Sequence, residues 1–521
     1  MLIPRYASKF ASLIGLAAAI GQTVGLLVGD VKGLAAGEHP GWKEPWALGG
    51  ERQTVLATSA TGLEQWIQSE YIYALEHIVQ NVLPNGAVIA SPSKSHPDYY
   101  YHWVRDAGLV MDLLAQLLPE NPTLIQPLLE LYANFSKKLQ QTPNLSNSPG
   151  EPKWNVDGSD YRQPWGRPQN DSPAIRAYSL IRYANYLLER NQTVAHLYHH
   201  ANFLTGIKGD LEFVSHHWQD TCFDIWEEVE GTHFYTRMVQ RRALREGADL
   251  ADRLGDDGAA RFYRMQAGII ESTLDDFWDP DKGYMVVTVN RTGGIDYKYT
   301  GLDVQIILSA LHAGLGDGVY TPDNDRILVT ATELNKAFAA LYPINSRYIG
   351  TAVGRYPEDT YDGYDTLKVG NPWPLATLAM SQIYYHLTSI WATQGRVDLT
   401  DVVRTKLLPV LGLKLASQPA VTADKSLQTA RVITRDNPEF LTALESLLSL
   451  GDHYMYRVQR HTDLDGRMFE QWNRNTGVGQ GAYDLNWSYA AFISAARARN
   501  HAKDLLKSLK QQQQQQWWRW W

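Results

Sequence analysis

Apolar residues recur at helical spacing along most of this chain. Leu63, Trp66, Ile67, Ile72 and Leu75 begin the first such stripe. Side chains three and four residues apart lie on one face of an α-helix, so a helix is predicted to begin near residue 61. The same spacing predicts twelve more helices, over residues 105–118, 122–141, 171–190, 207–218, 232–254, 257–277, 301–314, 326–341, 373–395, 399–413, 436–458 and 485–507. Strand-like alternation is scarce, with residues 284–289 the clearest stretch, and the pattern therefore predicts an all-α fold.

The long connections between these helices are not evenly distributed. Gly, Pro, Asp, Trp and Tyr gather in about every other connection, and most of the remaining connections are short. Antiparallel helix pairs arranged in a ring would bring the long connections together at one end, and six such pairs form an (α/α)6 barrel with a cleft at its mouth. A generic helical bundle is the alternative. Because no fixed-period repeat and no interdomain linker is found, residues 37–508 are expected to form one domain.

The composition excludes several classes of protein. The formal net charge of −8 disfavours a nucleic-acid partner, because phosphate binding needs basic stripes. Cys222 is the only cysteine, so neither an intrachain disulfide nor a cysteine-rich zinc site is possible. His196, His199 and His200 share a helix face without a His-Glu-x-x-His motif, and no metal site is expected. The chain has 17 Trp and 29 Tyr, whose flat rings fill cores and also stack on the apolar faces of sugars.

The N-terminus has the features of a targeting segment. Arg5 and Lys9 precede an uncharged run over residues 11–29, and small residues follow up to Ala36. Residues 1–36 are expected to be a cleaved secretory signal, with an uncleaved membrane anchor or a buried helix as the alternatives. Four asparagines stand in acceptor triplets for N-linked glycans, which agrees with a secreted glycoprotein; they are Asn134, Asn144, Asn191 and Asn290.

The C-terminus is a low-complexity tail over residues 509–521. It contains six consecutive glutamines at 511–516, and tryptophans flank Arg519. Such a composition cannot bury a core of its own. A disordered end without a role is expected, and a carbohydrate- or membrane-binding tail is the alternative.

Residues 223–229 combine three carboxylates with a tryptophan just before a predicted helix. Asp224, Glu227 and Glu228 surround Trp226. Adjacent residues of a helix lie about 100° apart, so Glu227 and Glu228 cannot share one role. Beside a tryptophan in a cleft, desolvation raises the pKa of a carboxyl group, as a general acid near neutral pH requires. An acidic first turn favoured by the helix dipole explains these residues equally well.

Four more polar clusters accompany this stretch. They are PDYYYHWVRD at residues 97–106, residues 150–157 with WGRPQNDSP at 165–173, GRYPEDTY at 354–361 with residues 370–373, and residues 469–472 with DLNWSY at 484–489. In this order, and with DIWEEVEG at 224–231, the clusters resemble the fungal and yeast glucoamylases of glycoside hydrolase family 15. The resemblance covers about residues 60 to 500, and a chance occurrence of all these motifs in one chain is improbable.

The resemblance implies an exo-acting, inverting glucan 1,4-α-glucosidase. Such an enzyme releases β-D-glucose from the non-reducing ends of starch, glycogen and malto-oligosaccharides, without a cofactor or a protein partner, and a monomer is expected. By motif, Glu227 corresponds to the general acid and Glu470 to the general base. The other implied contacts with substrate are Arg105 and Asp106 at subsite −1, Arg355 beside it, Glu228 at subsite +1, Trp165 over the acid, and Tyr99, Trp103, Asp224, Trp226, Tyr361 and Trp487 on the pocket wall. Asp359 is either a ligand contact or a loop scaffold.

The chemistry agrees with this assignment. Inversion needs one protonated carboxyl on the leaving oxygen and one carboxylate on a water across the ring, roughly 6.5–9.5 Å apart. Glu227 and Glu470 can meet across a barrel mouth, whereas neighbouring Glu227 and Glu228 cannot straddle a sugar. Residues 362–369 are additional to the shortest family pattern and could alter outer subsites, and no separate starch-binding domain is expected. The glycines at 477, 479 and 481 are interpreted as a flexible loop after the base.

Two other classes of function remain open on the sequence. A catalytically silent carbohydrate-binding module could share the fold, since fold alone does not prove activity, although the presence of both glutamates disfavours it. A trehalase or glucodextranase would share the inverting chemistry, and products from maltose, trehalose and dextran would separate these enzymes from a glucoamylase.

Overall fold

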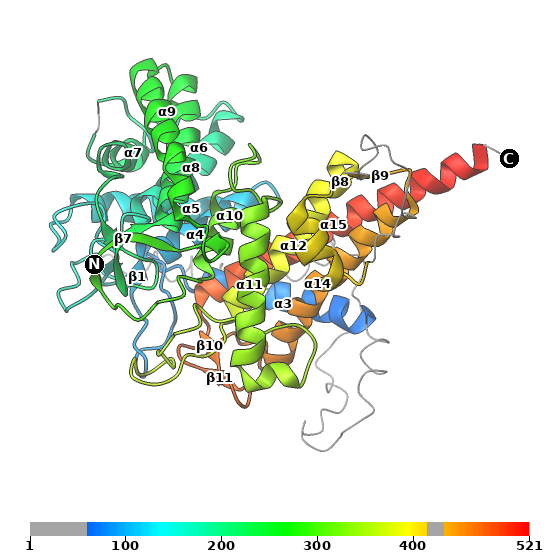
Figure 1. Ribbon diagram of the computed structural model, residues 1–521. Coiled ribbons are helices and arrows are strands. Elements are labelled where there is room, and N and C mark those ends of the chain that lie inside the picture. Colours follow the sequence, from blue (N-terminus) through cyan, green and yellow to red (C-terminus); the bar gives the residue numbers. More distant parts are fainter. Residues whose placement is uncertain (1–59, 202, 414–431, 520–521) are drawn as a thin grey trace.

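The structure is a computed structural model that describes residues 60–201, 203–413 and 432–519 (Figure 1). The predicted signal or anchor segment, residues 1–36, lies outside the described residues. Among the helices of the described part, none is both long and apolar enough to cross a membrane.

Six helices of the described chain form an inner ring in which each helix packs against the next and the last packs against the first. In ring order they are α4 (Val104–Leu117), α6 (Ser172–Leu188), α8 (Phe234–Arg253), α10 (Gln305–Ala313), α12 (Pro374–Gln394) and α15 (Asn486–Arg519). A helix enclosed on all sides must be buried around its circumference. Helix α4 shows this, since all of its residues except Gln116 are buried.

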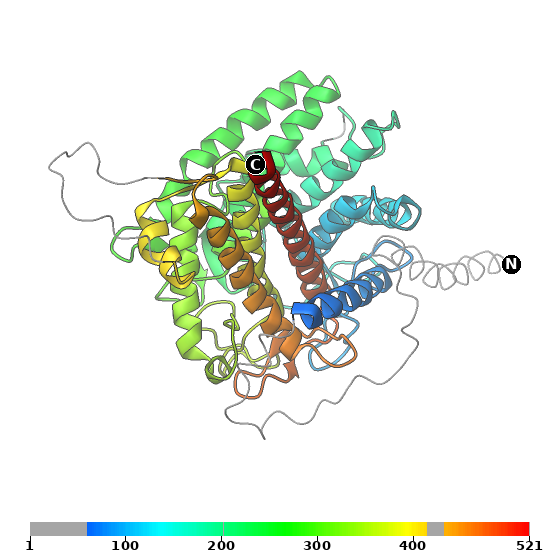
Figure 2. The ribbon, with the colours of Figure 1, turned by 90° about the vertical axis from the view of Figure 1, so that its right-hand side faces the viewer.

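Six more helices cover the ring from outside. They are α3 (Ala60–Gln80), α5 (Pro122–Gln141), α7 (Gly206–His217), α9 (Asp257–Ser272), α11 (Asp325–Leu341) and α14 (Pro438–His461). Each precedes an inner helix in the chain and packs on one or two members of the ring; Figure 2 shows α14 and α3 beside α15. The predicted all-α (α/α)6 barrel is therefore confirmed.

Short antiparallel strands pair within the connections between helices. The pairs are β1 (His102–Trp103) with β2 (Lys153–Trp154), β5 (Trp278–Asp279) with β6 (Tyr284–Met285), β8 (Arg396–Asp398) with β9 (Val432–Thr434), and β10 (Gln471–Trp472) with β11 (Gly479–Gln480). A three-stranded sheet joins β3 (Cys222–Phe223), β4 (Val229–His233) and β7 (Thr288–Gly294). The stretch predicted as one strand, 284–289, is divided between β6 and β7.

Two predicted helices are shorter or less regular than expected. Residues 401–410 are helical but irregular: two α-helical residues are followed by the π-helical turn η3 (Val403–Leu407) and the short α13 (Leu408–Val410). Pro409 has no N–H to continue the hydrogen-bond ladder, which limits this helix. Residues 257–277 divide into α9 and the 3-10 turn η1 (Leu274–Phe277), and a second such turn, η2 (Pro343–Ser346), follows α11.

The low-complexity tail does not begin at a structural boundary. Helix α15 continues through the glutamine run to Arg519, and Figure 1 shows its end extending beyond the body of the barrel. The expectation of a disordered end is therefore wrong as far as Arg519. Extending an existing helix costs far less than nucleating one, and glutamine is a fair helix former. Lys510 also pairs with Glu445 of α14 at 2.6 Å.

Candidate active site

A cavity of about 330 Å³ lies at the N-terminal ends of the inner helices. Twelve of the residues predicted from the sequence line it: Tyr99, Trp103, Arg105, Asp106, Trp165, Trp226, Glu227, Glu228, Arg355, Tyr361, Glu470 and Trp487. They come from the connections that precede α4, α6, α8, α12 and α15, or from the first turns of these helices. The barrel therefore gathers segments hundreds of residues apart at the N-terminal ends of its inner helices, where helix dipoles favour negative charge.

Glu227 lies in the turn between β3 and β4, and not in the first turn of a helix. Its φ is +69°, a left-handed conformation that costs a non-glycine residue of order 1–3 kcal/mol and is typical of functional sites. The Glu227 amide donates to the Asp224 carbonyl at 2.9 Å. Gly166 packs on the other side, and a Cβ added there would come within 2.5 Å of the Glu227 carbonyl oxygen. The helical interpretation of residues 223–229 is therefore wrong, because this segment pairs as a hairpin.

Two residues of the first cluster hold the side chain of Glu227. The indole N–H of Trp103 donates to Glu227 Oε1 at 2.8 Å. Arg105 Nη2 lies 3.5 Å from the same oxygen, and Arg105 Nη1 donates to Gln169 Oε1 at 2.6 Å. Both contacts fall on Oε1, which leaves Oε2 as the oxygen able to carry a proton.

Asp106 stands beside this group with unused hydrogen-bonding capacity. Burial raises its pKa to about 6, against the opposing effect of Arg105. Asp106 Oδ2 lies 3.4 Å from Arg105 Nη2 as an ion pair. Within the described residues it accepts no hydrogen bond, and the indole N–H groups of Trp165 and Trp373 donate none. Buried polar groups are nearly always paired in a native protein, so these atoms are available to a ligand with several hydroxyls.

Asp224 is fully buried behind the turn and does not line the cavity. Its Oδ1 accepts the backbone N–H groups of Glu228 and Val229 at 2.9 and 3.2 Å, and its Oδ2 lies 3.1 Å from Lys298 Nζ. Burial alone would raise the pKa of Asp224, but Lys298, His233 and the two amides hold it below its usual range. The expected pocket-wall position of Asp224 is corrected: its carboxylate shapes the turn that carries Glu227.

A second buried carboxylate also acts as a scaffold. Asp359 is 5% exposed and does not line the cavity. Its two oxygens accept from Nε and Nη2 of Arg355 at 2.8 and 2.6 Å. Nη2 of Arg355 also donates to Glu228 Oε1 at 2.8 Å, and the Tyr356 hydroxyl donates to Glu228 Oε2 at 2.6 Å. Of the two roles left open for Asp359, the structure shows the scaffold, because a bidentate ion pair occupies its carboxylate.

Glu470 faces the cavity from the segment before α15 and is 1% exposed. The Tyr99 hydroxyl donates to its Oε1 at 2.7 Å, and the Tyr361 hydroxyl donates to its Oε2 at 3.2 Å. Burial raises the pKa of Glu470 to about 8, while Tyr99, Arg355 and Tyr361 act in the lowering direction. Within the described part of the chain, the Glu470 side chain is thus held by two phenols and by no ion pair.

The glycine-rich turn after Glu470 has a defined structure. Gly477 lies in the turn that joins β10 to β11, Gly479 lies in β11, and Gly481, with a φ of +78°, directly follows β11. A Cβ on Gly481 would collide with Glu470 Oε2. The turn is therefore not a flexible loop: its backbone forms the support behind the carboxylate.

The sequence interpretation missed a lysine enclosed by aromatic rings. Lys153, the cross-strand partner of Trp103, is 2% exposed. Its Nζ lies 3.6 Å from the ring centroid of Trp165 and 4.3 Å from the centroids of Tyr101, Trp103 and Tyr161. Burial lowers the pKa of this ammonium to about 8. The signal available in the sequence was a lysine in the cluster GEPKWNVD, surrounded by aromatic motifs.

Three other contributors were also missed. Lys298 connects Asp224 to Asp303, whose oxygens accept the Trp226 indole N–H at 3.0 Å. Trp373 and Thr366 line the cavity. Lys298 is distant in sequence from the motifs it supports, so no local signal could have identified it.

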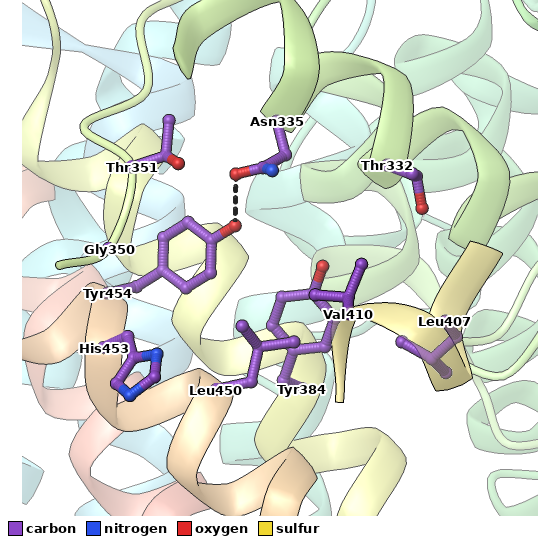
Figure 3. Close-up of a pocket in the computed structure, with 10 residues that line it drawn as sticks. All are labelled: Thr332, Asn335, Gly350, Thr351, Tyr384, Leu407, Val410, Leu450, His453 and Tyr454. Carbon is purple, nitrogen blue, oxygen red and sulfur yellow. Dashed lines mark hydrogen bonds between the residues drawn. The ribbon is translucent and has the colours of Figure 1, made fainter. Parts of the chain in front are cut away.

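A second cavity, of about 150 Å³, lies between α11, α12, η3, α13 and α14 (Figure 3). Its wall includes Asn335 and Tyr454, and the Tyr454 hydroxyl donates to Asn335 Oδ1 at 2.7 Å. No residue predicted for the active site lines it. In the described chain, no group of three or more His, Cys, Asp and Glu side chains is arranged to hold a metal ion.

Comparison with known proteins agrees with this geometry. Residues 70–497 match the model of glycosyl hydrolases family 15. Glucoamylase 1 of Rhizopus oryzae is 36% identical over 462 residues, which are 85% of this chain and 72% of that protein. A glucoamylase of Blastobotrys adeninivorans is 36% identical over 437 residues, covering 80% of this chain and 68% of that protein. The structure of a Saccharomycopsis fibuligera glucoamylase superposes with a TM-score of 0.75 at 33% identity, covering 85% of this chain and 96% of that one.

The fold and the paired carboxyl groups define a glycoside hydrolase. The chain belongs to glycosyl hydrolases family 15.

Proposed function

We propose that this protein is an exo-acting, inverting glucan 1,4-α-glucosidase that releases β-D-glucose from the non-reducing ends of starch, glycogen and malto-oligosaccharides. The observation that carries the proposal is that Glu227 and Glu470 line one cavity in a chain of this family. Inversion requires two carboxyl groups on opposite sides of one glycosidic bond, with room for a water beside the second.

Glu227 is the general acid. The hydrogen bond from Trp103 and the charge of Arg105 both fall on Oε1, so Oε2 carries the proton that passes to the leaving oxygen. General acid catalysis of this kind contributes typically 10²–10⁴-fold. Arg105 remains beside the carboxylate that forms and stabilises it.

Glu470 is the general base. It takes a proton from the water that attacks the anomeric carbon, while the hydroxyls of Tyr99 and Tyr361 hold its two oxygens. A raised pKa makes the carboxylate a stronger base once it is ionised, and the two phenols stabilise that ionised form.

Charged side chains bind the sugars on either side of the scissile bond. Arg105 and Asp106 bind the terminal glucose at subsite −1, which is supported by Asp106 Oδ2, an oxygen that accepts no hydrogen bond within the described residues. Glu228, held by Arg355 and Tyr356, binds the sugar at subsite +1. Trp165 packs over the acid, and Trp103, Trp226, Tyr361 and Trp487 form walls against which sugar rings stack.

The decisive experiment identifies the anomer released first from maltoheptaose. Proton NMR within the first minutes of hydrolysis should show β-glucose before mutarotation produces the α form. Initial release of α-glucose, or of maltose and longer products, would refute the proposal. Trehalose and dextran assayed in parallel separate this activity from that of a trehalase or a glucodextranase.

We also propose that the protein is a secreted, monomeric glycoprotein. Arg5, Lys9 and the uncharged run at 11–29 support a cleaved signal over an anchor. Of the acceptor asparagines, Asn134, Asn191 and Asn290 are exposed, as glycan attachment requires. N-terminal sequencing of the mature protein tests cleavage, endoglycosidase treatment tests the glycans, and sedimentation velocity tests the monomer.

A further inference from the structure

Exposed apolar side chains gather on two loops beside the active-site cavity. Of the fourteen large apolar residues that are exposed in the described part of the chain, five lie in residues 295–301 or 362–369. They are Tyr297, Tyr299, Tyr364, Leu367 and Val369. Exposed apolar residues scattered singly need no explanation, whereas a group of them beside a cavity marks a binding surface.

Two hydrogen-bonding contacts to Thr360 connect the two loops to each other. The Tyr297 hydroxyl lies 3.0 Å from Thr360 Oγ1. The backbone N–H of Lys368 donates to the Thr360 carbonyl at 3.0 Å. Tyr297 and Lys368, the neighbour of Leu367, therefore contact the same residue, Thr360. Leu367 is 86% exposed.

The same loops are continuous with the cavity. The backbone N–H of Ile295 donates to the Glu228 carbonyl at 2.9 Å, and Thr366, which precedes Leu367, lines the cavity. Both loops thus border the active-site cavity, one through the backbone of Glu228 and the other through Thr366. Because Glu228 is proposed to bind the sugar at subsite +1, the loop that contacts it is assigned to the leaving-group side of a bound substrate.

The loop 362–369 is fixed in place. Tyr364 stacks on His96 with parallel rings 4.3 Å apart. The side-chain amides of Gln480 and Asn371 both donate to the Asp362 carbonyl, at 2.6 and 3.2 Å. A surface that is ordered before binding loses little conformational entropy when a ligand arrives.

We propose that Tyr297 and Leu367 form an outer binding surface for the part of an α-glucan chain that remains outside the cavity on its leaving-group side. Glucose rings present apolar C–H faces that pack against an aromatic ring or an aliphatic side chain. Maltose is too short to reach this surface, whereas a heptasaccharide or a polymer extends across it. This inference rests on the proposed function, since it names a further contact of the same substrate.

The test compares maltose with maltoheptaose in the Leu367→Ser, Tyr297→Ala and Tyr297→Phe proteins. We expect the ratio of kcat/KM for maltoheptaose to kcat/KM for maltose to fall about fivefold in Leu367→Ser and Tyr297→Ala, a loss of about 1 kcal/mol. Tyr297→Phe keeps the ring and removes only the hydroxyl that contacts Thr360, so it should retain the wild-type ratio. Met265→Ser, at an exposed apolar residue of α9, is the matched control and should also retain it.

The outcomes separate this inference from the function itself. Wild-type protein that hydrolyses no α-1,4-glucan would refute the function. Active wild-type protein with an unchanged ratio in Leu367→Ser and Tyr297→Ala would overturn the outer surface alone. An equal fall of the ratio in Tyr297→Phe and Tyr297→Ala would assign the effect to the contact with Thr360. A changed oligomeric state without a changed ratio would assign the surface to a protein contact. Either result would also overturn the proposed outer surface.

Discussion

The Tyr99 hydroxyl donates a hydrogen bond to Glu470 Oε1 over 2.7 Å, although 371 positions separate the two residues in the chain. Tyr99 precedes the first inner helix and Glu470 precedes the last, so their contact depends on closure of the ring between α15 and α4. Glu470 is therefore held in place by the same packing that closes the barrel.

Replacing Tyr99 by Phe should move the acid limb of the pH profile. A hydroxyl that donates to a carboxylate favours its ionised form and lowers its pKa. Without it, the pKa of Glu470 rises further, and the ionised base forms only at higher pH. We expect the acid limb of kcat/KM to shift up by about one pH unit, since a hydrogen bond to a charged group contributes about 1.5–3 kcal/mol. Tyr101→Phe, whose hydroxyl donates to Asp98 instead, should leave the limb in place; a downward shift in Tyr99→Phe would contradict this account.

The two glutamates should respond differently to the leaving group. Glu227→Gln and Glu470→Gln are each expected to lower kcat on maltose by at least about 10³-fold, because each removes a proton transfer. On α-glucosyl fluoride, whose leaving group needs little protonation, Glu227→Gln should regain most of its rate and Glu470→Gln should not. Circular dichroism checks that both variants fold. Equal recovery of both on the fluoride would show that the roles are wrongly assigned.

Gly481→Ala should impair catalysis more than stability. Its added Cβ collides with Glu470 Oε2, and its φ is +78°. Gly255 has a similar φ of +74° and nothing within 4 Å of an added Cβ, so Gly255→Ala isolates the backbone cost of about 1–2 kcal/mol. Thermal unfolding should therefore show a similar loss of stability in both variants. By contrast, kcat should fall at least about tenfold only in Gly481→Ala. Normal turnover of Gly481→Ala would mean that this support is not required.

Lys153→Met should weaken the wall that carries Trp103 and Trp165. A desolvated cation–π contact contributes about 2 kcal/mol or more, and four rings surround this ammonium. We expect the free energy of unfolding to fall by about 2 kcal/mol and kcat/KM to fall with it, because Trp103 also holds Glu227. Lys94 lies over the single ring of Tyr100 at the surface, so Lys94→Met should change neither. Denaturant titration and initial rates measure both effects.

Glu70→Gln should stabilise the protein increasingly as the pH rises. Glu70 of α3 is buried, its Oε1 has no hydrogen-bond partner in the described residues, and burial raises its pKa to about 8. A carboxyl with a raised folded-state pKa stabilises the fold below its unfolded pKa and loses that contribution as the pH rises towards 8. The stability difference between Glu70→Gln and wild type should thus grow between pH 4.5 and 8, by at most about 1.4 kcal/mol per pH unit. Glu76→Gln, at a half-exposed site of the same helix, should show no such growth, and a constant difference for Glu70→Gln would contradict the prediction.

Local order was predictable wherever the chain repeats a simple pattern. Eleven of the thirteen predicted helices agree within a few residues at their starts and ends, or, for α3 and α15, at their starts. Residues 399–413 are helical over 401–410 as predicted from the apolar spacing, but the helix is irregular, because Pro409 has no N–H for an α-helical hydrogen bond. The identity and order of the polar clusters likewise indicated the family before any geometry was known.

What the sequence by itself determined is the set of helices, their alternation of long and short connections, and the residue types that the long connections carry. Only the tertiary structure decided which carboxylates face the cavity. Asp224 and Asp359 carry the same charge as Glu227 and Glu228, yet neither aspartate lines the cavity. Lys298 binds Asp224 and Arg355 binds Asp359 instead. Helical periodicity depends on residues that are close together in the sequence. By contrast, Asp224 pairs with a lysine 74 positions away, and Tyr99 pairs with Glu470; both contacts form only when the ring of helices closes.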